Sequence, residues 1–69
     1  MITSKLKSVR LAAVMTQQEL ASRAGVAKGT IVAAENGKEV RIRTVRKLAV
    51  TLGVSPQALL ASAEVRQET

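Results

Sequence analysis

The sequence predicts an all-α domain built from five short helices. Apolar residues recur at the spacing of one helix face along almost the whole chain, and no segment shows the sustained alternation typical of a strand. Glycines end three of these apolar segments, as they commonly do at helix C-termini. The chain has 69 residues, which is the length of one small domain.

The first helix is predicted at residues 4–13, with Thr3 or Ser4 as its N-cap. Its end is poorly marked, because Val14 is β-branched and resists the left-handed conformation that often follows a helix. Its buried face is expected to consist of Leu6, Val9 and Ala13.

The second helix is predicted at residues 17–24. Thr16 and Glu19 have the spacing of a capping box, in which each side chain accepts a hydrogen bond from the backbone N–H of the other residue. Gly25 follows as the C-terminal glycine. The buried face is expected to consist of Leu20, Ala21 and Ala24.

The third helix is predicted at residues 28–36. Its start is weakly marked because Ala27 is a poor N-cap, whereas Asn36 and Gly37 both tolerate the left-handed conformation that ends a helix. Its buried face is expected to consist of Thr30, Ile31 and Ala34.

The fourth helix follows a basic connection at residues 38–43. It is expected to begin at Arg43 or Thr44 and to end before Gly53. Its apolar face consists of Val45, Leu48, Ala49 and Leu52.

The fifth helix is short and begins with Ser55 as the N-cap and Pro56 at the first helical position. Residues 1–63 are therefore expected to form one domain, with residues 64–69 as a frayed tail. The large apolar residues of the fifth helix are Leu59 and Leu60.

The composition argues against several functional classes. The chain has no cysteine and no histidine, so it has no disulfide, thiolate nucleophile or histidine base. No serine therefore has a histidine partner, and no two carboxylates are spaced to share a proton. We therefore expect that the protein is not an enzyme. We also expect that it binds no cofactor, metal ion or small-molecule substrate. The absence of aromatic residues disfavours modules that stack single-stranded bases on aromatic rings.

The charge of the chain suggests a polyanionic partner. Lys and Arg number 11 against 5 Asp and Glu, which gives a net charge of +6. A highly charged surface with no such partner is the alternative. No apolar run approaches the ~18 residues that span a bilayer, and the opening MITSKLKSVR lacks the apolar core of a signal peptide. We therefore expect a cytoplasmic protein with no membrane partner.

The second and third helices have the features of a helix-turn-helix. Two short helices pack at a steep angle only when the first has a small residue at the crossing, which Ala21 supplies. The turn needs a residue that accepts positive φ, which Gly25 supplies. Ile31 is the branched residue that faces back into the angle. An ordinary αα-hairpin in a small bundle is the alternative.

The segment TQQELASRAGVAKGTIVAAENGK resembles the helix-turn-helix of the phage 434 repressor and Cro family, among the XRE-type regulators. The resemblance extends upstream through LKSVRL and downstream through LAVTLGVSPQALL, and covers about residues 2–62 without a gap. The motifs QxELA, ENGK and LAxxLGV are together quite specific for that fold. The resemblance implies a lambda-repressor-like DNA-binding domain that binds double-stranded DNA, as the domain of a transcriptional repressor or Cro-like regulator.

In that family the third helix enters the major groove, and its exposed residues contact base edges. The matching residues here are Lys28, Gly29, Thr30, Val32 and Ala33. Gly29 and Ala33 depart from the family pattern, because neither has a side chain that forms hydrogen bonds. Family contacts to phosphates or to the minor groove match Gln17, Asn36, Lys38, Arg41 and Arg43, with Arg10 as a secondary phosphate contact.

Arg10 falls on the apolar face of the first helix, so its charge needs a carboxylate partner. Glu35 matches the family's partner position, and we expect an ion pair that holds the first helix to the third. The resemblance also implies a weak homodimer on a two-fold DNA site. Its contacts match Pro56, Ala58 and Leu59.

Two other functions remain open. A divergent or redesigned scaffold is one, because the sequence lacks polar base-contacting residues at Gly29 and Ala33. A protein-interaction domain, such as an antitoxin or a chaperone-like coactivator domain, is the other, with Ala58 and Leu59 as its exposed contact surface.

Overall fold

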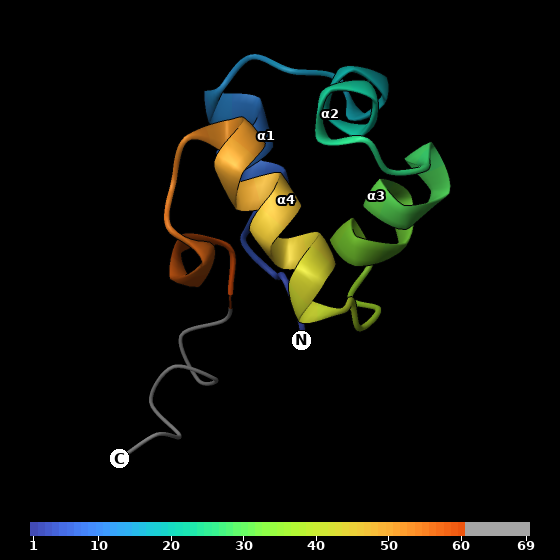
Figure 1. The fold of residues 1–69 in the computed structure, drawn as a ribbon, viewed down its shortest axis with the longest axis vertical. Coiled ribbons are helices and arrows are strands. Elements are labelled where there is room, and N and C mark those ends of the chain that lie inside the picture. The colour runs from blue at the N-terminus through green and yellow to red at the C-terminus, as the bar shows by residue number, and fades with distance from the viewer. Residues whose placement is uncertain (61–69) are drawn as a thin grey trace.

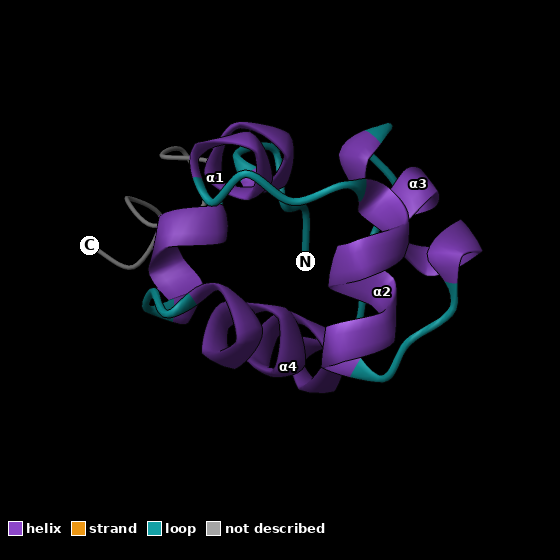
Figure 2. Cartoon of the chain, turned by 90° about the horizontal axis from the view of Figure 1, so that it is seen from above, coloured by secondary structure: helices purple, strands orange, loops and turns teal. Residues whose placement is uncertain are grey.

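The structure, a computed structural model, describes residues 1–60 and is helical (Figure 1). Viewed from above, α1 and α4 lie on opposite sides of the molecule, and α2 and α3 lie toward one end (Figure 2). The elements are α1 (Leu6–Ala12), α2 (Gln17–Ala24), α3 (Lys28–Glu35), α4 (Ile42–Leu52) and the 3-10 helix η1 (Pro56–Leu59). The all-α prediction is confirmed, with the correction that the fifth helix is a short 3-10 helix.

The core receives buried apolar side chains from every helix. Most of the predicted buried faces of α2, α3 and α4 are confirmed, since Leu20, Ile31 and Leu48 are fully buried. Burial of a leucine or isoleucine contributes ~1.5–3 kcal/mol, so these residues are the main source of stability in a domain without disulfides. The residues predicted at the margins of these faces, Ala24, Thr30 and Leu52, are only half-buried. The core residues are Leu6, Leu20, Ala21, Ile31, Ala34, Val40, Val45, Leu48, Ala49, Leu59 and Leu60.

The start of α1 differs from the prediction. The helix begins at Leu6, after Lys5 as an N-cap position that makes no side-chain capping bond. Thr3 is fully buried instead, and its hydroxyl donates to the backbone carbonyl of Ala34 on α3 at 3.4 Å. The expectation that Thr3 or Ser4 caps the helix is therefore wrong, because α3 supplies a buried acceptor that no local sequence pattern shows.

The end of α1 is strained at Val14. This residue has a φ of +56° and is 88% exposed. A β-branched residue in the left-handed region is unfavourable by ~1–2 kcal/mol. Ala13 is exposed rather than buried, because α1 ends at Ala12.

The C-terminal part corrects two further predictions. α4 begins at Ile42, one or two residues earlier than expected. Leu59 is fully buried, and its carbonyl accepts a hydrogen bond from the Lys5 N–H at 3.2 Å. The expectation that Leu59 is exposed for contacts is therefore wrong. The predicted domain boundary at residue 63 and the tail at 64–69 lie outside the described residues.

Within residues 1–60 no strand is formed, and an isolated antiparallel bridge joins Ile2 to Glu39. None of the helices in this range is long and apolar enough to cross a lipid bilayer.

Candidate nucleic-acid interface

The start of α2 is fixed by the predicted capping box. The Glu19 N–H donates to the Thr16 hydroxyl at 3.0 Å, and the Thr16 N–H donates to the Glu19 carboxylate at 2.8 Å. Two backbone donors at the helix start are thereby satisfied. The hydrogen bond from the Thr16 backbone is also the main reason why the pKa of Glu19 is lowered.

The turn from α2 to α3 depends on Gly25, whose φ of +73° lies in the left-handed region. The N–H groups of Gly25 and Val26 both donate to the carbonyl of Ala21, which closes the end of α2. Ala21 is 1% exposed and Ile31 is fully buried, as the helix-turn-helix prediction requires. The turn therefore directs α3 away from α2 at the protein surface (Figure 1).

The predicted ion pair between Arg10 and Glu35 is present and buried. The Arg10 Nε donates to Glu35 Oε2 at 2.6 Å, and a second guanidinium nitrogen donates to Oε1 at 3.1 Å. The remaining terminal nitrogen donates to the Met15 carbonyl at 2.7 Å. The side chains are only 8% and 4% exposed. This bidentate pair joins α1 to the end of α3.

Gln17 completes this network from the first residue of α2. Its side-chain amide donates to Glu35 Oε1 at 3.1 Å. Burial acts to raise the pKa of Glu35, but the hydrogen bonds from Arg10 and Gln17 and the positive charge of Arg10 lower it overall. The hydrogen bond to Glu35 also raises the pKa of Arg10. Glu35 is therefore a carboxylate held inward, so its negative charge is directed away from the outer face of α3.

The outer face of α3 contains the residues predicted to contact bases. Lys28 and Gly29 are exposed, and Asn36 at the helix end is exposed as well. The remaining predicted residues, Thr30, Val32 and Ala33, are half-buried. Much of this face is therefore accessible, with one cation at its start and small or branched side chains along its length.

The connection between α3 and α4 supplies exposed cations beside that face. Lys38, Arg41 and Arg43 are all exposed. Val40 anchors the segment, because its side chain is buried in the core and its N–H donates to the Met1 carbonyl at 2.8 Å.

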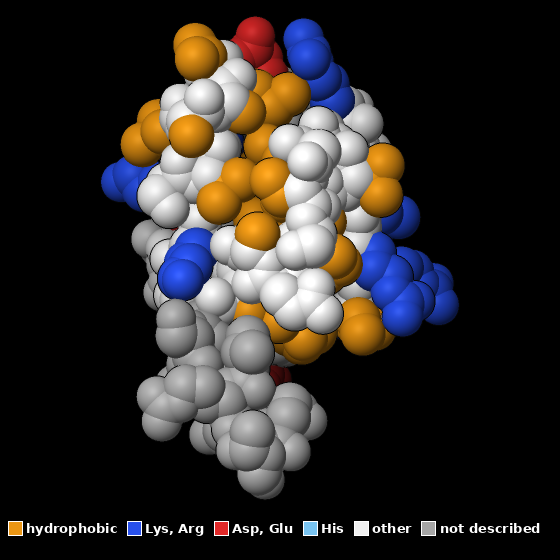
Figure 3. Space-filling model, turned by 90° about the vertical axis from the view of Figure 1, so that its left-hand side faces the viewer, with side chains coloured by type: hydrophobic (Ala, Val, Ile, Leu, Met, Phe, Trp, Pro, Cys, Tyr) orange, Lys and Arg blue, Asp and Glu red, His pale blue; other side chains and the backbone are white. Residues whose placement is uncertain are grey.

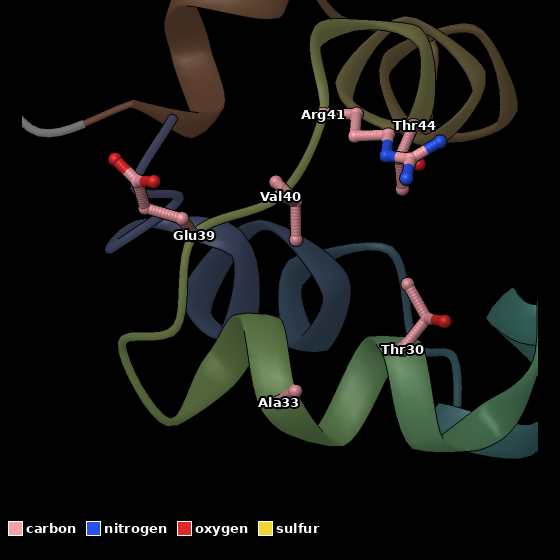
Figure 4. A pocket seen from close by; sticks show the side chains of 6 residues that line it. All are labelled: Thr30, Ala33, Glu39, Val40, Arg41 and Thr44. Carbon is pink, nitrogen blue, oxygen red and sulfur yellow. The ribbon is translucent and has the colours of Figure 1, made fainter.

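A cavity of about 270 Å³ separates α3 from this connection (Figure 4). In Figure 4 the Arg41 guanidinium lies beside Thr44, whereas the Glu39 carboxylate points away from both. The wall across the cavity from α3 therefore presents the Arg41 cation and the Thr44 hydroxyl, while the acidic Glu39 also lines the cavity. The lining residues are Thr30, Ala33, Glu39, Val40, Arg41 and Thr44.

The opposite side of the molecule is different in character. Figure 3 shows the side that carries η1, where hydrophobic side chains gather in the middle and Lys and Arg lie at the edges. The predicted dimer contacts Pro56 and Ala58 are half-buried, whereas Leu59 is not accessible.

Sequence reasoning missed two contacts that position the site. It assigned Gln17 to a phosphate and did not foresee its hydrogen bond to Glu35. It also missed the hydrogen bond from Thr3 to α3. The contact between Gln17 and Glu35 could have been inferred from the sequence, because a buried carboxylate needs hydrogen-bond donors and α2 begins with a glutamine.

Comparisons with known proteins agree with this geometry. A family model described as helix-turn-helix matches residues 6–59. The restriction-modification controller protein C.AhdI from Aeromonas hydrophila is 27% identical, with a TM-score of 0.78, over 84% of this chain and 89% of its own.

SinR, the master regulator for biofilm formation, is also similar. Its structure in complex with DNA has a TM-score of 0.79 and 32% identity, over 88% of this chain and 100% of that one. A SinR–SinI complex gives a TM-score of 0.80 and 29% identity, over 96% of this chain and 66% of that one. The chain therefore belongs to the XRE-type helix-turn-helix family of DNA-binding transcription regulators.

Proposed function

We propose that this domain binds double-stranded DNA by inserting α3 into the major groove, as part of a repressor or Cro-like regulator. The proposal rests mainly on the accessibility and charge of the outer face of α3. This face is accessible, its one carboxylate is turned inward onto Arg10, and exposed cations flank it. The similar SinR structure contains DNA, which supports the same use of the fold here.

Base recognition is assigned to the start and middle of α3. Lys28 donates to guanine O6 and N7, the acceptors that a lysine meets in the major groove. Thr30, Val32 and Ala33 place methyl groups where thymine methyl groups lie. This interface selects bases chiefly by shape and methyl contact, with one charged donor.

Gly29 has a distinct role in this proposal. Its φ does not require glycine, and a Cβ added there would meet no atom within 4 Å. A glycine inside a helix is unfavourable by ~1 kcal/mol relative to alanine, so the free domain gains nothing from it. We propose that Gly29 lets α3 lie close to the DNA, since the missing side chain allows the helix backbone to lie nearer to the bases.

Contacts to phosphates or to the minor groove are assigned to five residues at the edges of the interface. The second N–H of the Gln17 amide remains for a phosphate while the first is held by Glu35. Arg43 is assigned to the minor groove. Arg10 is assigned to the ion pair rather than to a phosphate, because its side chain is buried and each of its three guanidinium nitrogens already donates a hydrogen bond inside the protein. The five residues are Gln17, Asn36, Lys38, Arg41 and Arg43.

The domain binds as a weak homodimer on a two-fold site, with half-sites about one helical turn apart. Pro56 and Ala58 are the predicted contact residues that retain accessible surface. Function rests on binding rather than catalysis, and the protein acts in the cytoplasm, where its DNA lies.

Selection from a random duplex library at low salt tests the proposal. The expected result is an enriched palindromic motif whose half-sites are centred about 10 base pairs apart. Binding to all duplexes without enrichment supports the scaffold alternative, in which the fold is kept without sequence recognition. No binding to any duplex at low salt contradicts the proposal.

A further inference from the structure

A second surface hollow lies between the end of α2 and the middle of α4. It has a volume of about 360 Å³. Figure 1 shows α2 and α4 as neighbouring helices on the side nearest the viewer. The lining residues are Arg23, Ala24, Arg46, Lys47, Val50 and Thr51, and we call this surface the α2–α4 groove.

The charge of the α2–α4 groove has one sign. Three of its six lining residues are cations, and within the described part of the chain none of its lining residues is acidic. Arg23, Arg46 and Lys47 are all exposed. Glu19 lies one turn before Arg23 and its charge interacts with Arg23, but its carboxylate is bound to the Thr16 N–H at the start of α2 and does not line the groove. The groove therefore favours an anionic partner.

The groove also has an apolar wall. Val50 is 81% exposed and lies in the last turn of α4. Ala24 contributes a second small apolar surface from α2. A phosphate backbone gains nothing from contact with a valine side chain, whereas an aliphatic side chain of a protein does. The combination of cations with exposed valine therefore favours an acidic polypeptide over a nucleic acid.

The α2–α4 groove is separate from the proposed DNA interface. It shares no residue with the cavity beside α3. Arg23 and Ala24 lie at the C-terminal end of α2, whereas Gln17 lies at the N-terminal end, about 9 Å away along the helix axis. Arg43 lies one turn before Lys47 on α4, so DNA phosphates are the competing occupant that an experiment must test.

We propose that the α2–α4 groove binds a short acidic segment of a partner protein, with one aliphatic side chain of that segment against Val50. Carboxylates of the segment pair with Arg23, Arg46 and Lys47. The domain then binds DNA through α3 and a protein through this groove at the same time.

Selection of a displayed random peptide library on the immobilised domain tests the proposal. Recovered peptides are expected to combine Asp or Glu with Leu, Ile or Val. Lys47→Glu and Val50→Asp are each expected to weaken the binding of those peptides at least tenfold. Lys7→Glu, on the exposed side of α1, makes the same charge change as Lys47→Glu and is its control, so it should leave peptide binding unchanged.

Two measurements distinguish this groove from a DNA-binding surface. Val50→Asp should keep the circular dichroism spectrum and the DNA affinity of the parent. If Lys47→Glu weakens DNA binding as much as Arg43→Glu does, the groove cations serve the duplex and the proposal is wrong. Peptides without acidic residues, or acidic peptides that bind both groove variants normally, also overturn it.

Discussion

At the scale of single residues, the Arg10–Glu35 pair bears on the stability of the fold and on the charge of the proposed DNA interface. A buried bidentate pair contributes little compared with apolar residues of similar volume, but breaking it leaves one charge buried alone. The same pair keeps the carboxylate of Glu35 away from the outer face of α3. A negative charge on that face would repel the phosphates of a duplex.

Glu35→Gln should lower the free energy of unfolding by about 3 kcal/mol, because Arg10 then lies buried without a counter-charge. Urea denaturation followed by circular dichroism measures the loss. Glu39→Gln is the control, since Glu39 is exposed. Equal stability of the two variants would show that the ion pair contributes nothing.

Stability should also fall at low pH. The pKa values of Glu35 and Glu19 are lowered in the folded state, so both groups stabilise the fold at pH values above the unfolded pKa of about 4.3. That contribution is lost as the pH falls through their folded pKa values. Thermal unfolding from pH 6 to pH 2 should show a steeper decline for the parent than for Glu35→Gln. Parallel curves would contradict the assignment.

Gly29 gives a residue-scale test that separates folding from binding. Gly29→Ala should raise the free energy of unfolding by ~0.5–1 kcal/mol, because its backbone is helical and the added Cβ has open space. The same change should weaken DNA binding if close approach matters. Gly25→Ala, at φ +73°, should destabilise instead. A more stable Gly29→Ala domain with unchanged DNA affinity would remove the proposed role.

At the scale of elements, the sequence predicted those helix bounds and buried faces that depend on residues close together in the chain. The capping box and Gly25 fixed α2 within the chain, and the apolar spacing gave the buried residues of α3 and α4. The predictions that were wrong concern features that depend on contacts between distant parts of the chain. The hydroxyl of Thr3 bonds to α3 rather than capping α1, and a four-residue 3-10 helix is too short for its spacing to show that Leu59 faces the core.

The end of α1 provides an element-scale prediction. Val14→Asn should raise the free energy of unfolding by about 1 kcal/mol, because asparagine tolerates the left-handed backbone that valine adopts with strain. Val50→Asn is the matched control, since Val50 is also exposed but lies inside a helix. A similar change in both variants would show that the effect comes from losing an exposed apolar side chain.

At the scale of the whole molecule, charge and shape divide the surface by function. Nine of the described cations are exposed, while the acidic residues of α2 and α3, Glu19 and Glu35, are held by internal hydrogen bonds. The bridge from Ile2 to Glu39 ties the start of the chain to the basic connection. Sequence patterns cannot show such long-range pairing, so the cavity beside α3 was not predicted.

The salt dependence of DNA binding tests this division. Affinity should fall steeply as salt increases, because phosphate contacts release condensed counterions. Arg43→Ala should reduce the slope of log affinity against log salt by about 1. Lys7→Ala, on α1, should leave the slope unchanged. An equal effect of the two variants would mean that attraction is spread over the whole surface rather than concentrated beside α3.

The most direct test of the central claim is a nuclear magnetic resonance titration of the labelled domain with a selected duplex. We predict the largest amide shift changes along the outer face of α3, at Lys28, Gly29 and Ala33, and in the connection that carries Arg41. Changes concentrated on α1 and η1, with α3 unaffected, would show that another surface meets the DNA.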